Sequence, residues 1–589
     1  MKPGDIDLSD PRSFVEGVPH DYFAMLRREA PVSWQPRSDG TGPGFWCITR
    51  YQDIVSAEKQ VPLFSSRTNI SPMPAPETSV ATQLDHNLIL SDPPRHGFLR
   101  RLIMTGFSPK AIQKIEAQMR VYARQAVDSV IERGECDFVD VAAYLPVEVV
   151  SDILGVAPYD RPRLFEWANL MFGTQDSELS SPTRNLIGAM EMFTYARQLG
   201  AKKRAHPVDD IFSTIAVAQE NGQQLSDTDL GSLFLLMATA GNETTRTQAI
   251  HGIHLLMEHR DVMEQLRAKP DLMPNAVEEM LRLTTPAMGF MRKLTDDTVF
   301  EGQPMKAGDK VMLWYVSGNR DESVFPEAGR FNITRSNARD HLSFGARGAP
   351  HMCLGAMLAR TELRIVLSEV IERIPDIALA GRIERQTSNF TNGVKRMPVR
   401  FTPGRSSEQP PVNRLYQSHA AAKATTAAPP PQKAAPRPEV ETTESGDNDM
   451  PIKLIPLATA TLKLGTPTVM PEGPRGTRLI VEVASATWEG ERLRAKQLKG
   501  AAGDWALVAP DGTLSIDVRA TLETHDGALI FLNYQGRSDY TKAGAAPLVI
   551  APLFETGDPR YAWLNKVQAI GRGTALDMET LVYEIYEVM

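Results

Sequence analysis

Residues 405–450 contain almost no side chains that could build a hydrophobic core. The segment is rich in Ala and Pro between residues 420 and 438, and it continues into a polar, acidic run at 439–449. This composition is typical of a flexible tether that proline partly stiffens. The chain therefore cannot fold around a single core, and we expect two domains, residues 1–404 and 451–589, joined by a linker at 405–450.

The overall composition excludes several classes of protein. A net charge of −8 argues against nucleic-acid binding, and three scattered cysteines give neither a disulfide framework nor the paired spacing of a zinc or iron–sulfur site. No apolar run approaches the roughly 18 residues of a membrane span, and the N-terminal residues lack the apolar segment of a signal peptide. We expect a cytoplasmic protein with no membrane anchor.

The two parts of the chain differ in their hydrophobic periodicity. Residues 1–404 are dominated by helical spacing, whereas 451–589 show short β-branched runs at 478–483, 514–519 and 528–533. Turn sequences Pro-Asp-Gly at 510–512 and His-Asp-Gly at 525–527 separate these runs. We therefore predict a mainly helical first domain and a second domain that is an antiparallel β-sandwich or barrel.

One thiol stands in an unusual setting. Cys353 follows the glycine-rich stretch that runs from Phe344 to His351, and small residues and an apolar helical run come after it. A free cysteine is usually a buried hydrophobe, as expected for Cys47 and Cys136. At a helix start next to cations, however, the anionic sulfur is favoured. A single thiolate presented in this way can serve as the axial ligand of a haem iron.

A long helix predicted at 227–258 carries polar residues in its middle, Ala-Gly-Asn-Glu-Thr-Thr at 240–245. Glycine, asparagine and threonine disfavour a helix interior, and threonine can disturb the backbone hydrogen bonds enough to bend it. Such a turn suits a groove that holds O2 and water. Thr244 could hydrogen-bond to dioxygen, and Glu243 could begin a proton path.

Further charged residues could hold a cofactor or lock the fold. His96 and Arg100 lie at i, i+4 of one predicted helix, and with Arg292 and His351 they form a set of cations suited to the two propionates of haem. Glu279 and Arg282 share one helical face and, if buried, would form a structural ion pair that Arg330 could join.

Taken together, these stretches resemble the cytochrome P-450 family, specifically its soluble bacterial members, over residues 5–404. The resemblance implies a mainly-α cytochrome P-450 fold with a small β-sheet region, and haem b (iron protoporphyrin IX) with Cys353 as the proximal iron ligand. It assigns Glu243 and Thr244 to oxygen activation and His96, Arg100, Arg292 and His351 to the propionates. Glu279, Arg282 and Arg330 match the family's structural triad.

The loop before the thiol departs from the family pattern Phe-Gly-x-Gly-x-His-x-Cys. Phe344 and Cys353 are nine positions apart instead of seven, while His351 keeps its offset. We expect the extra length to enlarge the bulge near Arg347 and to leave ligation intact. The position of Gly348 and the surface that docks a redox partner are then open questions.

Residues 451–589 resemble a family of small bacterial and fungal β-barrel domains whose function is largely undefined. The resemblance rests on stretches at 504–508, 510–513, 517–519 and 554–565. A small barrel can enclose one apolar ligand, and the charged, aromatic run at 554–565 could line its mouth. Ligand binding or chemistry on an oxidised product remains open beside a structural or assembly role.

The sequence therefore predicts a haem-thiolate monooxygenase that inserts one oxygen atom from O2 into an apolar sterol, terpenoid or lipid-like molecule. Electrons would come from a separate ferredoxin and ferredoxin reductase, because the chain shows no nucleotide-binding fingerprint or cysteine cluster of its own. Two alternatives stay open. One is a non-oxygenating haem protein, and the other is a bifunctional enzyme whose barrel isomerises, cyclises or hydrolyses the oxidised product.

Overall fold

The computed structural model forms two compact units, residues 1–418 and 419–589. It describes residues 2–37, 42–72, 86–172, 175–176, 178–179, 182–407, 453–465, 468–473, 476–509, 513–539, 548–575 and 580–588. The predicted linker at 405–450 lies outside this set from residue 408 onward, as does the predicted turn at 510–512.

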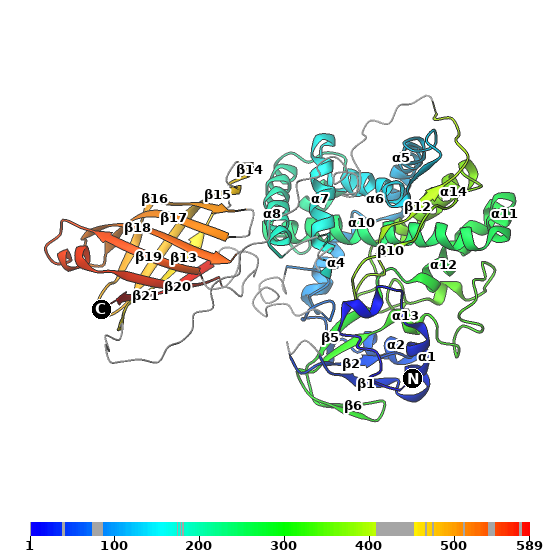
Figure 1. Ribbon diagram of the computed structural model, residues 1–589, viewed down its shortest axis with the longest axis horizontal. Coiled ribbons are helices and arrows are strands. Elements are labelled where there is room, and N and C mark those ends of the chain that lie inside the picture. Colours follow the sequence, from blue (N-terminus) through cyan, green and yellow to red (C-terminus); the bar gives the residue numbers. More distant parts are fainter. Residues whose placement is uncertain are drawn as a thin grey trace, which may run out of the picture. The chain divides into compact units, whose positions relative to one another are not determined.

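The first unit is mainly helical (Figure 1). Its α-helices are α1 (His20–Glu29), α2 (Tyr51–Lys59), α4 (Arg95–Met104), α5 (Pro109–Asp128), α6 (Phe138–Leu154), α7 (Arg161–Phe172), α8 (Pro182–Ala205), α9 (Ile211–Val217), α10 (Asp227–Glu258), α11 (Arg260–Ala268), α12 (Met273–Thr284), α13 (Tyr315–Gly318) and α14 (Ala356–Arg373).

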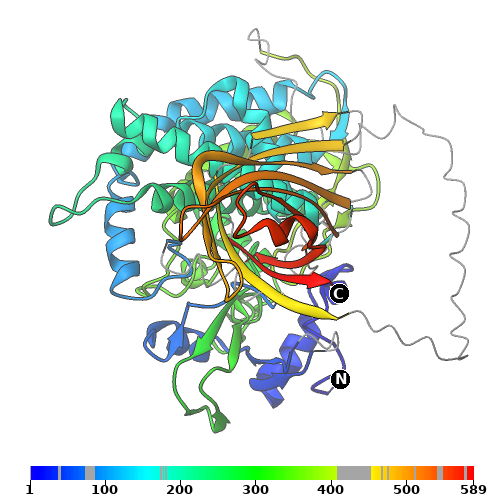
Figure 2. The same cartoon turned by 90° about the vertical axis from the view of Figure 1, so that its left-hand side faces the viewer.

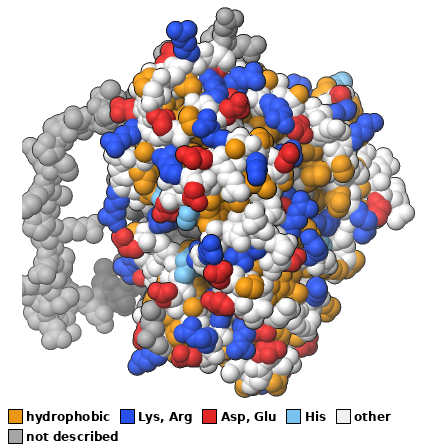
Figure 3. Space-filling model, turned by 90° about the vertical axis from the view of Figure 1, so that its right-hand side faces the viewer, with side chains coloured by type: hydrophobic (Ala, Val, Ile, Leu, Met, Phe, Trp, Pro, Cys, Tyr) orange, Lys and Arg blue, Asp and Glu red, His pale blue; other side chains and the backbone are white. Residues whose placement is uncertain are grey.

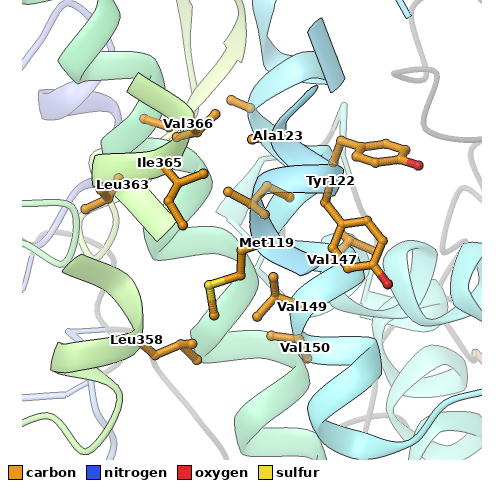
Figure 4. Close-up of a cluster of buried hydrophobic side chains, with 14 of the residues drawn as sticks. Met119, Tyr122, Ala123, Val147, Val149, Val150, Leu358, Leu363, Ile365 and Val366 are labelled. Atoms are coloured by element: carbon orange, nitrogen blue, oxygen red, sulfur yellow. The ribbon is translucent and has the colours of Figure 1, made fainter. Parts of the chain in front are cut away.

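The central helix is α10, which spans the residues predicted for it and runs through the polar turn without a break. Its start is fixed by a capping box, in which Ser226 and Asp229 each bond to the other's backbone N–H. The helix packs against α6, α7, α8, α12 and α14. On another side of this core, apolar residues of α5, α6 and α14 interdigitate around Met119, as Figure 4 shows.

Small sheets flank the helices. The largest has the strand order β1 (Val32–Gln35), β2 (Phe45–Ile48), β8 (Lys310–Leu313), β5 (Phe290–Leu294) and β3 (Phe64–Ser65). It places Arg292 on β5, opposite Val311 of β8. The smaller sheets are β4 (Glu135–Asp137) with β12 (Pro398–Arg400) and β9 (Ala378–Leu379), β10 (Glu384–Arg385) with β11 (Val394–Arg396), and β6 (Thr298–Phe300) with β7 (Gln303–Met305).

The second unit is an antiparallel barrel. Its strands are β13 (Leu454–Leu464), β14 (Thr468–Gly473), β15 (Gly476–Glu489), β16 (Ala495–Val508), β17 (Thr513–Thr524), β18 (Leu529–Asp539), β19 (Leu548–Glu555), β20 (Ala569–Ala575) and β21 (Thr580–Val588). Pairing of β13 with both β21 and β15 closes the ring, and β14 adds to the outside of β15.

Burial in the barrel alternates residue by residue, as in β17, so one face of each strand points into an apolar interior. The predicted strands at 478–483 and 514–519 lie within β15 and β17, and the one at 528–533 begins one residue before β18. The predicted turn at 525–527 lies between β17 and β18. Figure 2 looks into the ring, where the short 3-10 helix η6 (Ala562–Lys566) lies among the strands. The structure confirms the predicted fold class for both domains.

Among the described residues, no helix is long and apolar enough to cross a membrane. The face of the molecule in Figure 3 mixes Lys and Arg with Asp and Glu, with no continuous basic area.

Candidate active site

Cys353 lies two residues before the N-cap of α14, at the end of a closed loop. Its backbone N–H donates to the carbonyl of Phe344 across 2.8 Å. The side chain is accessible, yet enough protein surrounds the thiol that desolvation raises its pKa. Backbone N–H groups of Gly355 and Ala356 and the guanidiniums of Arg100 and Arg360 act in the opposite direction and favour the thiolate. The thiol is therefore recessed and ready to bind a ligand.

The two extra residues of the Cys loop are accommodated in successive turns between Phe344 and Cys353. Ala349 donates to Ala346 across 3.0 Å, and Gly345 and Gly348 both have φ of +80°, a left-handed conformation that favours glycine. Ala346 and Ala349 are buried, whereas Arg347 and Gly348 are exposed. The added length thus projects outward as a bulge at Arg347, as the sequence predicts.

The base of this loop is clamped to α12 and α14. The Arg360 guanidinium lies 4.5 Å from the centre of the Phe344 ring, and its Nε donates to Glu278 across 2.7 Å. The other Glu278 oxygen lies 3.1 Å from Nε2 of His341, at the start of the loop. Burial by itself would raise the pKa of Glu278, but the His341 and Arg360 hydrogen bonds outweigh it and lower the pKa to about 2.

The four predicted propionate partners are brought together. His96 and Arg100 lie on α4, and the rings of His96 and His351 have centroids 4.1 Å apart. Arg100 and Arg292 both act electrostatically on His351, and Arg100 also acts on Cys353. Residues from α4, β5 and the Cys loop, far apart in the sequence, therefore meet around one thiol.

One expectation about this cluster needs correction, because its two histidines are not cations in this arrangement. Burial, and then the neighbouring guanidiniums, lower the pKa of His96 to about 4 and of His351 to about 2. Neutral imidazoles can donate an N–H to a carboxylate, whereas the positive charge comes from Arg100 and Arg292. The sequence pattern reveals the residue types but not the desolvation that removes their charge.

Sequence reasoning missed Glu58 of α2, which links several parts of the site by hydrogen bonds. Its buried carboxylate accepts hydrogen bonds from Arg292 across 3.3 Å, from the Tyr315 hydroxyl and from the backbone N–H of Ala346 in the Cys loop. A glutamate near the end of a short amphipathic helix gives no signal of this role, because the same pattern describes a solvated surface charge.

The structural ion pair is present, but its third member is Arg335 and not Arg330. Arg282 donates to Glu279 across 2.7 and 2.8 Å, and both side chains are fully buried. Arg335 adds two contacts of 3.1 Å to the same carboxylate. Arg330 points outward, 70% exposed, toward Glu327, and offers only its backbone carbonyl to the pair. The loop turns between residues 326 and 335, so sequence order could not tell which arginine reaches inward.

On α10, Thr244 and Glu243 are adjacent in sequence but differ in environment. The Thr244 hydroxyl is partly accessible and donates to the Ala240 carbonyl across 2.8 Å. Glu243 is buried, where its carboxylate pairs with Arg246 and accepts a 3.3 Å hydrogen bond from Thr247. Arg246 in turn donates to Asn169 of α7 across 2.8 Å. The acid is therefore held by α10 and α7 and does not hydrogen-bond to Thr244 directly.

The residues present fit a haem group. His96 is 2% exposed, and its Nε2 has no protein hydrogen-bond partner among the described residues, as expected for a donor meant for a cofactor carboxylate. A recessed thiol lies near this imidazole and two guanidiniums, which matches one axial ligand and two propionates. In the described part of the chain, no group of three or more His, Cys, Asp or Glu could hold a metal ion.

Comparison with known proteins gives the same picture for each half of the chain. A family profile described as cytochrome P-450 matches residues 147–374, and one described as a protein of unknown function, DUF3237, matches residues 452–588. The chain is 35% identical over 410 residues to linalool 8-monooxygenase of Pseudomonas putida, covering 67% of this chain and 99% of that protein.

Two further proteins extend this similarity. Steroid C26-monooxygenase of Rhodococcus jostii is 33% identical over 407 residues, which cover 68% of this chain and 85% of that protein. The solved structure of Mycobacterium marinum cytochrome P-450 CYP268A2 in complex with pseudoionone superimposes with a TM-score of 0.61 at 33% identity. It covers 68% of this chain and 100% of that one.

Proposed function

This chain belongs to the cytochrome P-450 family and is a monooxygenase of apolar molecules, and from that premise we propose that its substrate is a terpenoid, sterol or similar branched lipid. The names of its relatives, a linalool and a steroid monooxygenase, support this class, as does the solved neighbour that holds pseudoionone. All three molecules are largely apolar, with few polar groups for a pocket to recognise.

The assignment of the cofactor to haem b rests on the cluster around the thiol. Cys353 would be the axial ligand, His96 and His351 would donate N–H bonds to the propionates, and Arg100 and Arg292 would neutralise their charge. When bound, the iron supplies the activation of O2, and electron donation from the thiolate favours O–O cleavage. The chain's own residues would hold the cofactor at the loop that precedes α14.

Thr244 and Glu243 would manage protons beside the cofactor. The partly accessible Thr244 hydroxyl donates to Ala240, and its oxygen can accept a further hydrogen bond. Glu243, bound by Arg246 and Thr247, would relay protons from the region of α7. This acid and alcohol pair favours oxygen activation over a sensor or other non-oxygenating haem protein, which needs no proton supply.

Electrons would come from a separate ferredoxin and ferredoxin reductase in the cytoplasm. Neither family match includes a reductase, and the described residues contain no cysteine cluster for an iron–sulfur group. The outward bulge at Arg347 lies on the same loop as Cys353, and this is the surface at which an electron donor would approach the thiolate side.

The observation that carries the proposal is the convergence of four propionate partners on one accessible thiol. Cys353→Ser in the full chain should abolish the thiolate absorption band of the reduced, CO-bound protein. Cys136→Ser is the matched control, because Cys136 lies on β4, outside this cluster, and should leave the band unchanged. Retention of the band in Cys353→Ser would refute the ligand assignment.

The substrate class can be tested by spectral titration with linalool, pseudoionone and a steroid that carries an alkyl side chain. We expect at least one to displace water and shift the haem spectrum, whereas a short polar acid such as acetate should not. If all three fail while the haem is intact, the proposed substrate class is wrong.

A second function, chemistry in the barrel, is favoured by one specific observation. The barrel interior contains an inward-facing carboxyl group, Asp504, whose pKa is raised by burial. If the barrel converts the oxidised product, a variant that lacks the monooxygenase activity should keep the barrel activity. A variant that lacks the barrel activity should likewise keep the monooxygenase activity.

A further inference from the structure

The barrel interior is largely apolar. Along β16, inward positions alternate with outward ones, and Asp504 takes an inward position because it pairs with the buried Val518 of β17. Its inward neighbours one step along the strand are Ala502 and Ala506. A charged residue at such a position costs stability unless it has partners.

Asp504 has little to compensate that cost. One oxygen accepts a long 3.3 Å hydrogen bond from the backbone N–H of Asp517. Desolvation, the largest influence, raises the pKa of Asp504 to about 7, and this one hydrogen bond offsets it only in part. The side chain is nevertheless partly accessible, so the carboxyl group can be reached and is divided between its two protonation states near neutral pH.

Two phenols lie in the same interior. Tyr534 of β18 and Tyr583 of β21 have ring centroids 5.9 Å apart in an edge-to-face arrangement, and both are buried. Burial raises the pKa of both phenols, so each keeps its proton at neutral pH and can donate a hydrogen bond.

Asp504 and Tyr534 share one row of the inward face, because Val518 of β17 pairs with both, and Tyr583 packs against Tyr534. The charge of Asp504 raises the pKa of each phenol. A second polar group faces the interior on the same strand, because Gln497 pairs with the buried Leu522. Its Nε2 donates to Val483 across 2.6 Å, while its buried Oε1 has no partner among the described residues. The apolar interior thus carries one carboxyl group, two phenols and one amide oxygen that has no partner among the described residues.

A carbonyl group beside an acidic C–H bond fits this combination. The carbonyl oxygen takes the hydrogen bond from the phenol, and the carboxylate takes the proton from the adjacent carbon. An apolar body fits the rest of the interior, which Leu532, Ile550 and Ile585 line. A polar ligand would leave its groups unpaired against these side chains.

We propose that the barrel interior is a second catalytic site, in which Asp504 removes and returns a proton next to the carbonyl group of an apolar ketone. The C–H bond breaks and an O–H bond forms on Asp504, while the electron pair moves to the carbonyl oxygen, which the Tyr583 hydroxyl stabilises. The proton then returns to the same carbon or, in an unsaturated ketone, to the far end of the conjugated system. No oxidant or reductant is required.

This site depends on the proposed function of the first domain only for the expectation that its ligand is apolar. The barrel site and the monooxygenase function can be tested separately, because proton transfer requires no electron donor. Full-length protein is incubated in D2O with pseudoionone or progesterone and without a reductant, and deuterium incorporation next to the carbonyl group is followed by NMR.

We expect the native chain to exchange at least one of these ketones faster than buffer does. Asp504→Asn should lose about 100-fold or more of the added rate, as is typical for loss of a positioned base. Tyr583→Phe should lose about tenfold or more of it. Glu584→Gln, which removes a carboxylate from an exposed, outward-facing position of β21, is the matched control and should exchange normally.

The outcomes divide clearly. Exchange that persists in Cys353→Ser but is lost in Asp504→Asn supports the barrel site whether or not the monooxygenase assignment holds. Exchange at the native rate in Asp504→Asn, with Tyr583→Phe also unaffected, overturns it. Failure of the native chain to exceed buffer with both ketones overturns it as well. Circular dichroism of each variant confirms that the strands are intact.

Discussion

Nη2 of Arg292 lies 3.3 Å from Oε1 of Glu58, and the other oxygen of that carboxylate accepts the backbone N–H of Ala346. One buried acid therefore links a predicted propionate partner on β5 to the loop that carries Cys353. Glu58 is therefore a positioning residue, because its carboxylate holds both the Arg292 guanidinium and the loop that carries Cys353.

We expect Glu58→Gln to weaken haem retention and to lower stability. The amide cannot neutralise the buried Arg292, and breaking a buried pair costs about 3–5 kcal/mol. The measurement is haem content per chain together with thermal unfolding. Glu58→Asp, which keeps the charge, should recover part of both, and a merely space-filling role would give no such recovery.

Substitution at the third arginine should distinguish Arg335 from Arg330. Arg335→Ala leaves the buried Glu279 with one partner fewer. The free energy of unfolding of this variant should therefore fall by about 3 kcal/mol or more. Arg330→Ala removes only an exposed pair with Glu327, worth about 0–1 kcal/mol. Denaturant unfolding of the two variants, under identical conditions, compares them directly. Equal losses would contradict the assignment of Arg335.

Thr244→Ala should waste electrons during turnover. The variant loses a hydroxyl near the proposed oxygen site, so less reductant should be recovered as product and more as hydrogen peroxide. Thr239→Ala is the matched control, since Thr239 bonds to its own helix at Leu235 one turn earlier. Unchanged coupling in Thr244→Ala would count against its role in proton supply.

Asp504→Asn should stabilise the barrel, and more so at high pH. Burial raises the Asp504 pKa to about 7, above the roughly 3.9 of an unfolded aspartate, so the folded state holds its proton more tightly. Stability then falls as pH rises from about 4 to 7, and the full cost applies above 7.

The Asn variant has no carboxyl group to ionise, so it does not lose stability in this way. Its gain in melting temperature should therefore be near zero at pH 4 and largest at pH 8, as scanning calorimetry of the barrel transition can show. The groups that face Asp504 are Asp517, Tyr534 and Tyr583, and burial raises the pKa of both tyrosines above its ordinary value. A gain that does not vary with pH would indicate a packing effect.

The parts of the site predicted from sequence are those fixed by local spacing. His96 and Arg100 share one helix face, Glu279 and Arg282 another, and the position of Cys353 follows from its own loop. Spacing within one element survives folding, because helical geometry determines which side chains are neighbours.

The parts that sequence could not predict depend on how distant segments meet. Arg335 replaces Arg330 because of the path of an irregular loop, and Glu58 acts on residues more than two hundred positions away. The charge of His96 depends on desolvation by its surroundings, which no local pattern records. Asp504 belongs to a stretch that carries the resemblance of the second domain, but only the register with Val518 shows that it points inward.

The barrel can close only when β21, its last strand, pairs with β13, its first. The first strand of the second unit pairs along its length with the last, from Leu454 opposite Val588 to Lys463 opposite Thr580. Contacts between such distant segments form slowly, because the intervening chain must first be ordered. During synthesis the helical unit is complete long before residues 580–588 exist, so it can fold, and acquire its cofactor, while the barrel is still an open sheet.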